Sequence, residues 1–101
     1  MLRLARVTPA TLDVLRELLS AEDALWGLRI VTATGRPAGS VYPILARLED
    51  GGWVASRWDE SGARGARRRF YELTADGRAS AVALVAERSA RPAARPEVGL
   101  A

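Results

Sequence analysis

Apolar positions early in the chain recur at intervals of three and four residues, which is the spacing of one face of an α-helix. This face consists of Leu12, Val14, Leu15, Leu18 and Leu19. Thr8 followed by Pro9 is typical of a helix start, because the threonine hydroxyl can accept a hydrogen bond from a free amide and proline loses no bond there. The pattern predicts a first helix that runs to about Ser20.

A second and shorter apolar run extends from Leu25 to Val31 and is followed by Gly35. Glu22 and Asp23 precede this run, and acidic side chains stabilise the amino-terminal end of a helix. The sequence therefore predicts a second helix that begins near these two acids and stops near Gly35.

The stretch GSVYPILARLEDGG predicts a third helix with two contrasting faces. The apolar face consists of Val41, Ile44, Leu45 and Leu48. At about 100° per residue, the opposite face consists of Gly39, Tyr42, Pro43 and Ala46, with Ser40 and Arg47 toward one flank. We expect the first face to be buried, and Gly51 and Gly52 to end the helix.

Pro43 leaves the start of this third helix open. A start near Gly39 or Ser40 would place Pro43 in the first turn, where a missing amide hydrogen costs little. A start at Pro37 would place it farther inside and should bend the helix.

Beyond Gly52 the pattern changes to a period of two, which is typical of a β-strand. Residues 53–60 alternate between two faces, and Arg68–Leu73 resembles a returning strand. Residues 61–66 contain two glycines and no large apolar side chain, so we expect a loop. Together these segments predict a hairpin with a basic tip.

Thr74, with Asp76 two positions later, predicts the cap of a fourth helix that extends to about Ala90. From Arg91 the chain has two prolines and no periodic pattern, which predicts a disordered tail. Three helices, a hairpin and a further helix, in this order, predict a mainly α protein with a β-hairpin wing (α+β), that is, a winged helix-turn-helix with an additional carboxy-terminal helix.

The composition narrows the function. The 101 residues suffice for one small domain and include neither cysteine nor histidine, which removes most metal, haem and nucleophilic chemistry. We expect no enzyme activity, no metal and no cofactor. The sequence shows neither an apolar run of about 20 residues nor a signal-peptide pattern, so we expect no membrane association and a cytoplasmic location.

All fifteen cationic residues are arginines, and the net charge is +3. A dense group without any acid lies at the predicted hairpin tip and consists of Arg64, Arg67, Arg68 and Arg69. The planar guanidinium suits phosphates and guanine edges, so these are candidate DNA-binding residues. An ordinary solvated hairpin end is the alternative. Strand alternation predicts Arg67 and Arg69 on one face and Arg68 on the other.

The outward face of the third helix supplies the other candidate DNA-binding residues. The hydroxyl groups of Ser40 and Tyr42 could contact phosphates or base edges, although Tyr42 could instead cover the rim of the core. Gly39 and Ala46 have little bulk and would let the helix approach a groove closely. Pro43, Arg36 and Arg47 are further candidates, and Arg47 could equally pair with Asp50.

The segment GSVYPILARLEDGGWV, followed by SRW and RRRFYELTADGR, resembles the PadR family of bacterial transcriptional regulators. The matching residues are Gly39, Ser40, Val41, Tyr42, Pro43, Leu45, Arg47, Leu48, Glu49 and Gly52. The segment LWGLRI is similar to the family's second-helix pattern but departs from it at Leu28 and Arg29. The resemblance extends from about Leu12 to Leu84.

This resemblance implies a homodimeric repressor that occludes promoter DNA, with the third helix in the major groove and the wing on the backbone or in the minor groove. Short members of the family dimerise through the first helix and a single carboxy-terminal helix, which here implies an interface of Leu12, Leu15, Leu19, Val82, Leu84 and Val85. Some dimers of the family bind flat aromatic effectors between these helices.

We therefore expect the chain to divide into an arm (1–7), the winged helix-turn-helix (8–73), a dimerisation helix (74–90) and a tail (91–101). A winged helix that docks another protein without binding specific DNA is the alternative.

Overall fold

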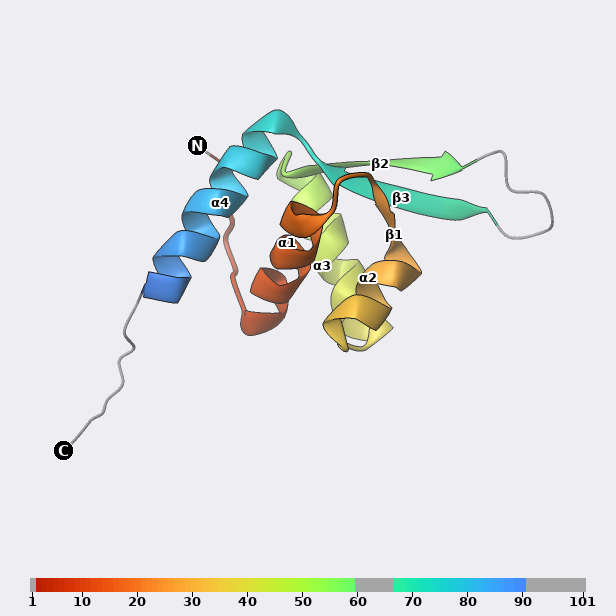
Figure 1. Ribbon diagram of the computed structural model, residues 1–101, viewed down its shortest axis with the longest axis horizontal. Coiled ribbons are helices and arrows are strands. Elements are labelled where there is room, and N and C mark those ends of the chain that lie inside the picture. The colour runs from red at the N-terminus through yellow and green to blue at the C-terminus, as the bar shows by residue number, and fades with distance from the viewer. Residues whose placement is uncertain (1, 60–66, 91–101) are drawn as a thin grey trace.

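The computed structural model describes residues 2–59 and 67–90, and Figure 1 shows how the elements are arranged. The helices are α1 (Pro9–Ser20), α2 (Gly27–Thr34), α3 (Ala38–Asp50) and α4 (Ala75–Ala90). The strands are β1 (Leu25–Trp26), β2 (Val54–Asp59) and β3 (Arg68–Leu73). The order of elements is that of a winged helix-turn-helix with a further helix, as the sequence predicts.

The three strands form one antiparallel sheet in the order β1-β3-β2. The long pair, β2 and β3, runs in register from Val54 opposite Leu73 to Asp59 opposite Arg68, and it projects away from the helices as the wing (Figure 1). Both long strands match the predicted hairpin. Residues 61–66, including Arg64, and the predicted disordered tail lie outside the described residues.

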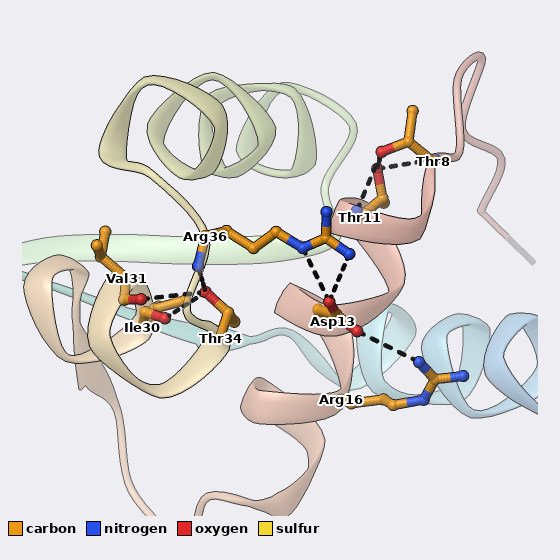
Figure 2. Close-up of polar contacts among 8 residues, drawn as sticks. All are labelled: Thr8, Thr11, Asp13, Arg16, Ile30, Val31, Thr34 and Arg36. Carbon is orange, nitrogen blue, oxygen red and sulfur yellow. Dashed lines mark hydrogen bonds and ion pairs between the residues drawn. The ribbon is translucent and has the colours of Figure 1, made fainter.

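Helix α1 begins where the sequence predicts. Thr8 and Thr11 cap it reciprocally, since each backbone amide donates to the other residue's hydroxyl, at 3.1 Å from Thr8 and 3.2 Å from Thr11 (Figure 2). Two of the amides that a helix start leaves without partners are therefore satisfied.

The second helix starts later than predicted. Leu25 and Trp26 form β1, which pairs with Tyr71 and Phe70 of β3, and α2 begins only at Gly27. The acids at positions 22 and 23 precede a strand rather than a helix. The helix ends at Gly35 as predicted, with φ at 71° in the left-handed region that glycine tolerates.

Helix α3 begins at Ala38, with Pro37 in an extended conformation just before it. Of the two starts considered, the structure therefore lies close to the Pro37 alternative. Pro43 is inside the helix, which continues through it to Asp50. Gly52, with φ at 83°, then turns the chain into β2.

The core lies between the helices and the inner face of the sheet. It contains Val14, Leu15, Leu18, Ile30, Val41, Ile44, Leu45, Leu48, Trp53, Val54, Tyr71 and Ala81. Helix α4 packs against α1, and Thr74 caps it by accepting a hydrogen bond from the Gly77 amide at 2.8 Å. None of the helices in the described part of the chain is long and apolar enough to cross a membrane.

Candidate nucleic-acid interface

Helix α3 presents the two faces that the sequence predicts. Val41, Leu45 and Leu48 are fully buried, whereas Gly39, Tyr42, Pro43 and Ala46 on the opposite side are exposed. A Cβ atom placed on Gly39 would meet no atom within 4 Å. The outward face of α3 is therefore exposed, with open space at Gly39.

Tyr42 is the one large side chain among these outward residues, and it is 41% exposed. Its ring lies against Gly27 at the start of α2, where a Cβ would lie 2.5 Å from the Tyr42 Cε1 atom and 2.7 Å from its hydroxyl oxygen. Gly27 thus leaves room for the tyrosine ring. The ring covers the end of α2 and still leaves much of its surface in solvent.

A hollow of about 420 Å³ opens beside Tyr42, between α2, α3 and the wing. We call it the wing hollow. Aromatic side chains and the wing arginines provide most of its lining, which is Trp26, Gly27, Leu28, Tyr42, Trp58, Arg67, Arg68, Arg69 and Tyr71. The structure therefore brings Tyr42 and three of the predicted DNA-binding arginines to one place.

The wing arginines lie on aromatic rings. The guanidinium carbon of Arg67 is 4.6 Å from the centre of the Trp58 ring, and that of Arg69 is 5.2 Å from the same ring. Arg68 lies 4.4 Å above Trp26, on β1. Arg67 and Arg69 therefore share one face and Arg68 takes the other, as strand alternation predicts. Such stacking restrains a guanidinium while leaving its N–H groups able to donate.

Arg69 is also held by polar contacts within the protein. Its Nε donates to the Ser56 hydroxyl at 3.0 Å, and its Nη2 lies 3.3 Å from a carboxylate oxygen of Glu49 on α3. The ion pair links the wing to α3. Burial raises the pKa of the neighbouring Tyr71, and the charge of Arg69 partly opposes this shift.

Arg36 also has an acidic partner within the chain. Its Nε and Nη2 lie 3.0 and 2.9 Å from one carboxylate oxygen of Asp13 on α1, and Arg16 approaches the other oxygen at 3.5 Å (Figure 2). The contact ties the turn between α2 and α3 to α1. This gives Arg36 a structural role that its sequence position did not reveal.

Arg47 is exposed, and within residues 2–59 and 67–90 it forms no ion pair with Asp50 or another acid. It borders a second hollow, of about 230 Å³, together with Ser40, Pro43 and Gly39 of α3 and with Arg6 and Thr8 of the amino-terminal segment. Arg6 was not among the candidates predicted from the sequence. The sequence does show that Arg3 and Arg6 both precede Asp13, the first acid of the chain, and so form a basic amino-terminal segment.

The sequence profile of the transcriptional regulator PadR-like family matches residues 18–83. The chain belongs to this family. The match spans α2, α3 and the wing and confirms the resemblance drawn from the Tyr-Pro segment. The PadR-like family and the fold together identify the chain as a DNA-binding transcriptional regulator. Among curated proteins, none matches this chain.

Solved structures similar to this PadR-like chain share its fold. A putative DNA-binding protein from Ralstonia eutropha has a TM-score of 0.62 at 21% identity, over 78% of this chain and 98% of the other. MepR from S. aureus, in its DNA-binding conformation, has a TM-score of 0.69 at 23% identity, over 82% and 59%. BpsR from Bordetella bronchiseptica, whose DNA binding is regulated by 6-hydroxynicotinic acid, has a TM-score of 0.65 at 25% identity, over 91% and 70%.

The residues that the PadR resemblance implies for dimerisation differ in how much surface they expose. Leu15 is fully buried within one chain, and Leu19, Leu84 and Val85 are partly buried against the same core. Leu12 is half-buried and Val82 is 54% exposed. Leu15 has no surface left for a second copy, so Val82 and Leu12 are the residues best placed to meet one.

Proposed function

We propose that the protein is a homodimeric repressor that inserts α3 into the major groove and lays the wing along the DNA backbone, so that promoter DNA is occluded. The observation that carries this proposal is the contrast between the faces of α3. A fully buried apolar face fixes the helix, and the opposite face is exposed, consists of small residues apart from Tyr42, and is free of acidic residues. A helix of this kind can enter a groove about 12 Å wide without a clash.

On α3, we propose that Ser40 and Tyr42 contact base edges or phosphates, with Gly39, Pro43 and Ala46 forming the surface that approaches the groove. The position of Tyr42 supports this role, because packing against Gly27 orients the ring while 41% of the residue stays exposed. A restrained side chain loses less conformational entropy on binding than a free one.

In the wing, we propose that Arg67 and Arg68 contact phosphates. Both are exposed and stack on tryptophan rings, which supports a preorganised contact. Arg69 is paired with Glu49, so we assign it chiefly to holding the wing against α3. Arg64 lies outside the described residues and stays a prediction.

We propose that residues 8–73 form the DNA-binding part and that α4 joins α1 in forming the dimer. Val82 is a large apolar side chain on the solvent side of α4, and exposed alanines, Ala79 and Ala86, flank it. Replacing Val82 by Asp should convert the dimer to monomer, as measured by analytical ultracentrifugation. Ala33→Asp, at an exposed site on α2, should leave the dimer unchanged. A wild-type monomer at micromolar concentration would contradict this part.

An aromatic effector between the α4 helices stays a prediction. Trp53 is only 2% exposed, and Trp26 and Trp58 lie on the sheet strands. None of the three tryptophans therefore stands on the outer face of α4, and an effector there would have to rely on aliphatic side chains.

Selection of genomic fragments by the purified protein tests the proposal directly. We expect recovery of a palindromic site at about 0.1 M salt, with half-sites that report the dimer spacing. Tyr42→Ala combined with Arg67→Ala should abolish the shift of this fragment in a gel. A reporter gene placed downstream of the fragment should be repressed by the wild-type protein and not by the double variant. If no fragment is bound, or if the double variant binds as well as wild type, DNA recognition by this face is wrong and protein docking is favoured.

A further inference from the structure

The amino-terminal arm, residues 2–7, is fixed to the body of the protein at two backbone positions. The amide of Leu2 donates to the hydroxyl of Ser80 on α4 at 2.9 Å, and the indole of Trp53 donates to the carbonyl of Arg3 at 3.3 Å. Leu2 and Leu4, on either side of Arg3, pack against the core. In Figure 1 the arm runs beside α4 before it enters α1. The arm is therefore an ordered part of the fold.

This anchoring directs the arginines of the arm outward. Leu2 and Leu4 face the core, whereas the side chains of Arg3 and Arg6 are exposed. Their position relative to α3 is set by the arm's backbone contacts, so Arg6 lies at the edge of the hollow that also borders Arg47.

The hollow that Arg6 and Arg47 share has the lining of an anion site. We define the arm site as Arg6, Thr8, Ser40 and Arg47, which contribute two guanidinium groups and two hydroxyl groups. None of the described residues that line this hollow is acidic. Next to it, a hollow of about 280 Å³ is lined by Arg3, Arg6 and Arg47 with one acid, Asp50. Here the arginines outnumber the acids three to one.

The arm site and the wing hollow lie on different flanks of α3. Gly39, Ser40, Pro43 and Arg47 are the α3 residues that border the arm site with Ile44, whereas Tyr42 is the α3 residue that borders the wing hollow. A duplex that received the outward face of α3 would bring a backbone strand to each flank. Guanidinium groups with no competing carboxylate are suited to its phosphate oxygens.

We infer that the arm site binds backbone phosphate of the DNA on the flank of α3 away from the wing. This inference rests on the proposed function, and it adds Arg6 to the DNA-contacting residues and gives Arg47 a phosphate partner. Arginines would then contact the DNA backbone on both sides of α3. One set belongs to the wing, and the other includes Arg6 from the segment that precedes α1.

Salt dependence of DNA binding tests the arm site, because each neutralised phosphate contributes about 0.9 to the slope of log K against log salt. Fluorescence anisotropy with the full chain would use two labelled duplexes, one of random sequence and one selected from genomic fragments. For the Arg6→Ala, Arg47→Ala double variant, we expect the slope to fall by about 0.9 for one phosphate or about 1.8 for two, on both duplexes. An unchanged slope would overturn the inference.

Matched variants separate this outcome from other causes. Arg78→Ala removes one positive charge from α4, as each single arm-site substitution does, and should leave the slope unchanged. Arg6→Lys keeps the charge and should retain most of the slope, while Asp50→Asn should tighten binding to both duplexes. Arg6 and Arg47 are exposed, so the thermal midpoint of the double variant should equal that of wild type. A fall in slope with Arg78→Ala about half as large as with the double variant would mean that only net charge matters, because the double variant removes two charges, and would also overturn the inference.

The same measurements give different results if the arm site is wrong and if the proposed function is wrong. Tyr42→Ala should weaken binding to the selected duplex without changing the slope. If wild type binds neither duplex, the proposed function is wrong. If wild type binds and Tyr42→Ala behaves as expected while the double variant keeps the full slope, only the arm site is wrong.

Discussion

Helices α3 and α4 both have small residues along one side, but on opposite sides with respect to the core. In α3 the large residues Val41, Leu45 and Leu48 face inward, and Gly39 and Ala46 face solvent. In α4 the buried positions are Gly77, Ser80 and Ala81, and the bulky Val82 faces solvent.

A small residue therefore has two distinct physical uses in this protein. At Gly77 an added Cβ would overlap the carbonyl group of Trp53, so the missing side chain lets the backbone of α4 approach that of Trp53, just before β2. At Gly39 an added Cβ would touch nothing, so the missing side chain keeps space open for something outside the molecule. A larger side chain at Gly77 should therefore reduce stability, and a larger side chain on the outward face of α3 should reduce DNA binding.

The largest effect is expected from Ala46→Trp on the outward face of α3. The indole would hold the helix away from the groove, and affinity for the selected duplex should fall by about 1000-fold, to the level of non-specific binding. The free energy of unfolding should change by less than about 0.5 kcal/mol, because the position is exposed. Ala55→Trp, at an exposed position on β2, is the control and should bind normally. A variant that fails to fold would mean that the outward face is packed after all.

Gly77→Ala should have the next largest effect, and it should affect stability. The methyl group can be accommodated only if α4 moves away from Trp53, because the obstructing atoms belong to the backbone. Overpacking of this kind should lower the free energy of unfolding by about 2 to 3 kcal/mol. This loss exceeds the stabilisation that alanine, with its higher helix propensity than glycine, would contribute. Denaturant titration measures the loss. Gly39→Ala is the matched control and should be neutral or slightly stabilising.

Gly27→Ala lies between these two cases, because the atoms that it would meet belong to a side chain. The new methyl should push the Tyr42 ring away from α2 at little cost in stability and weaken DNA binding by about 3- to 10-fold, the value of one displaced hydrogen bond. In a Tyr42→Ala background the same change should cost nothing further. Additive losses in anisotropy measurements would show that Gly27 acts independently of the tyrosine.

The smallest effect is expected from Glu49→Gln at the edge of the α3 buried face. The substitution weakens a partly exposed ion pair with Arg69, so stability should fall by only about 0.2 to 1 kcal/mol. With the carboxylate gone, Arg69 becomes available to phosphate, and DNA affinity should rise. Glu72→Gln, which breaks the exposed pair with Arg57, is the control. Lower DNA affinity in Glu49→Gln would indicate that Arg69 needs its acidic partner to position the wing.

Periodicity predicted the elements that are long enough to show a period. It placed α1, the buried face of α3, both wing strands and α4, because each has several apolar residues in a regular pattern. Strand β1 has only two residues and shows no period, and its existence depends on pairing with Phe70 and Tyr71 far along the chain. The acids before it therefore suggested a helix start where a strand lies.

The roles of individual arginines could be predicted only in part. Sequence predicted which face of the wing each arginine occupies, since alternation is a local property. It could not predict that Arg36 pairs with Asp13, 23 positions away, or that Arg69 pairs with Glu49, 20 positions away, because these partners meet only in the folded chain. The arm site was missed for the same reason.

Pro43 leaves one main-chain carbonyl of α3 without its usual hydrogen-bond donor. In an α-helix the carbonyl of residue 39 accepts a hydrogen bond from the amide of residue 43, and proline has no such hydrogen. The Gly39 carbonyl therefore lacks its normal helical donor, and Gly39 is exposed. The outward face of α3 thus includes a main-chain acceptor that does not depend on the residue at position 39, and only replacement of Pro43 would remove it.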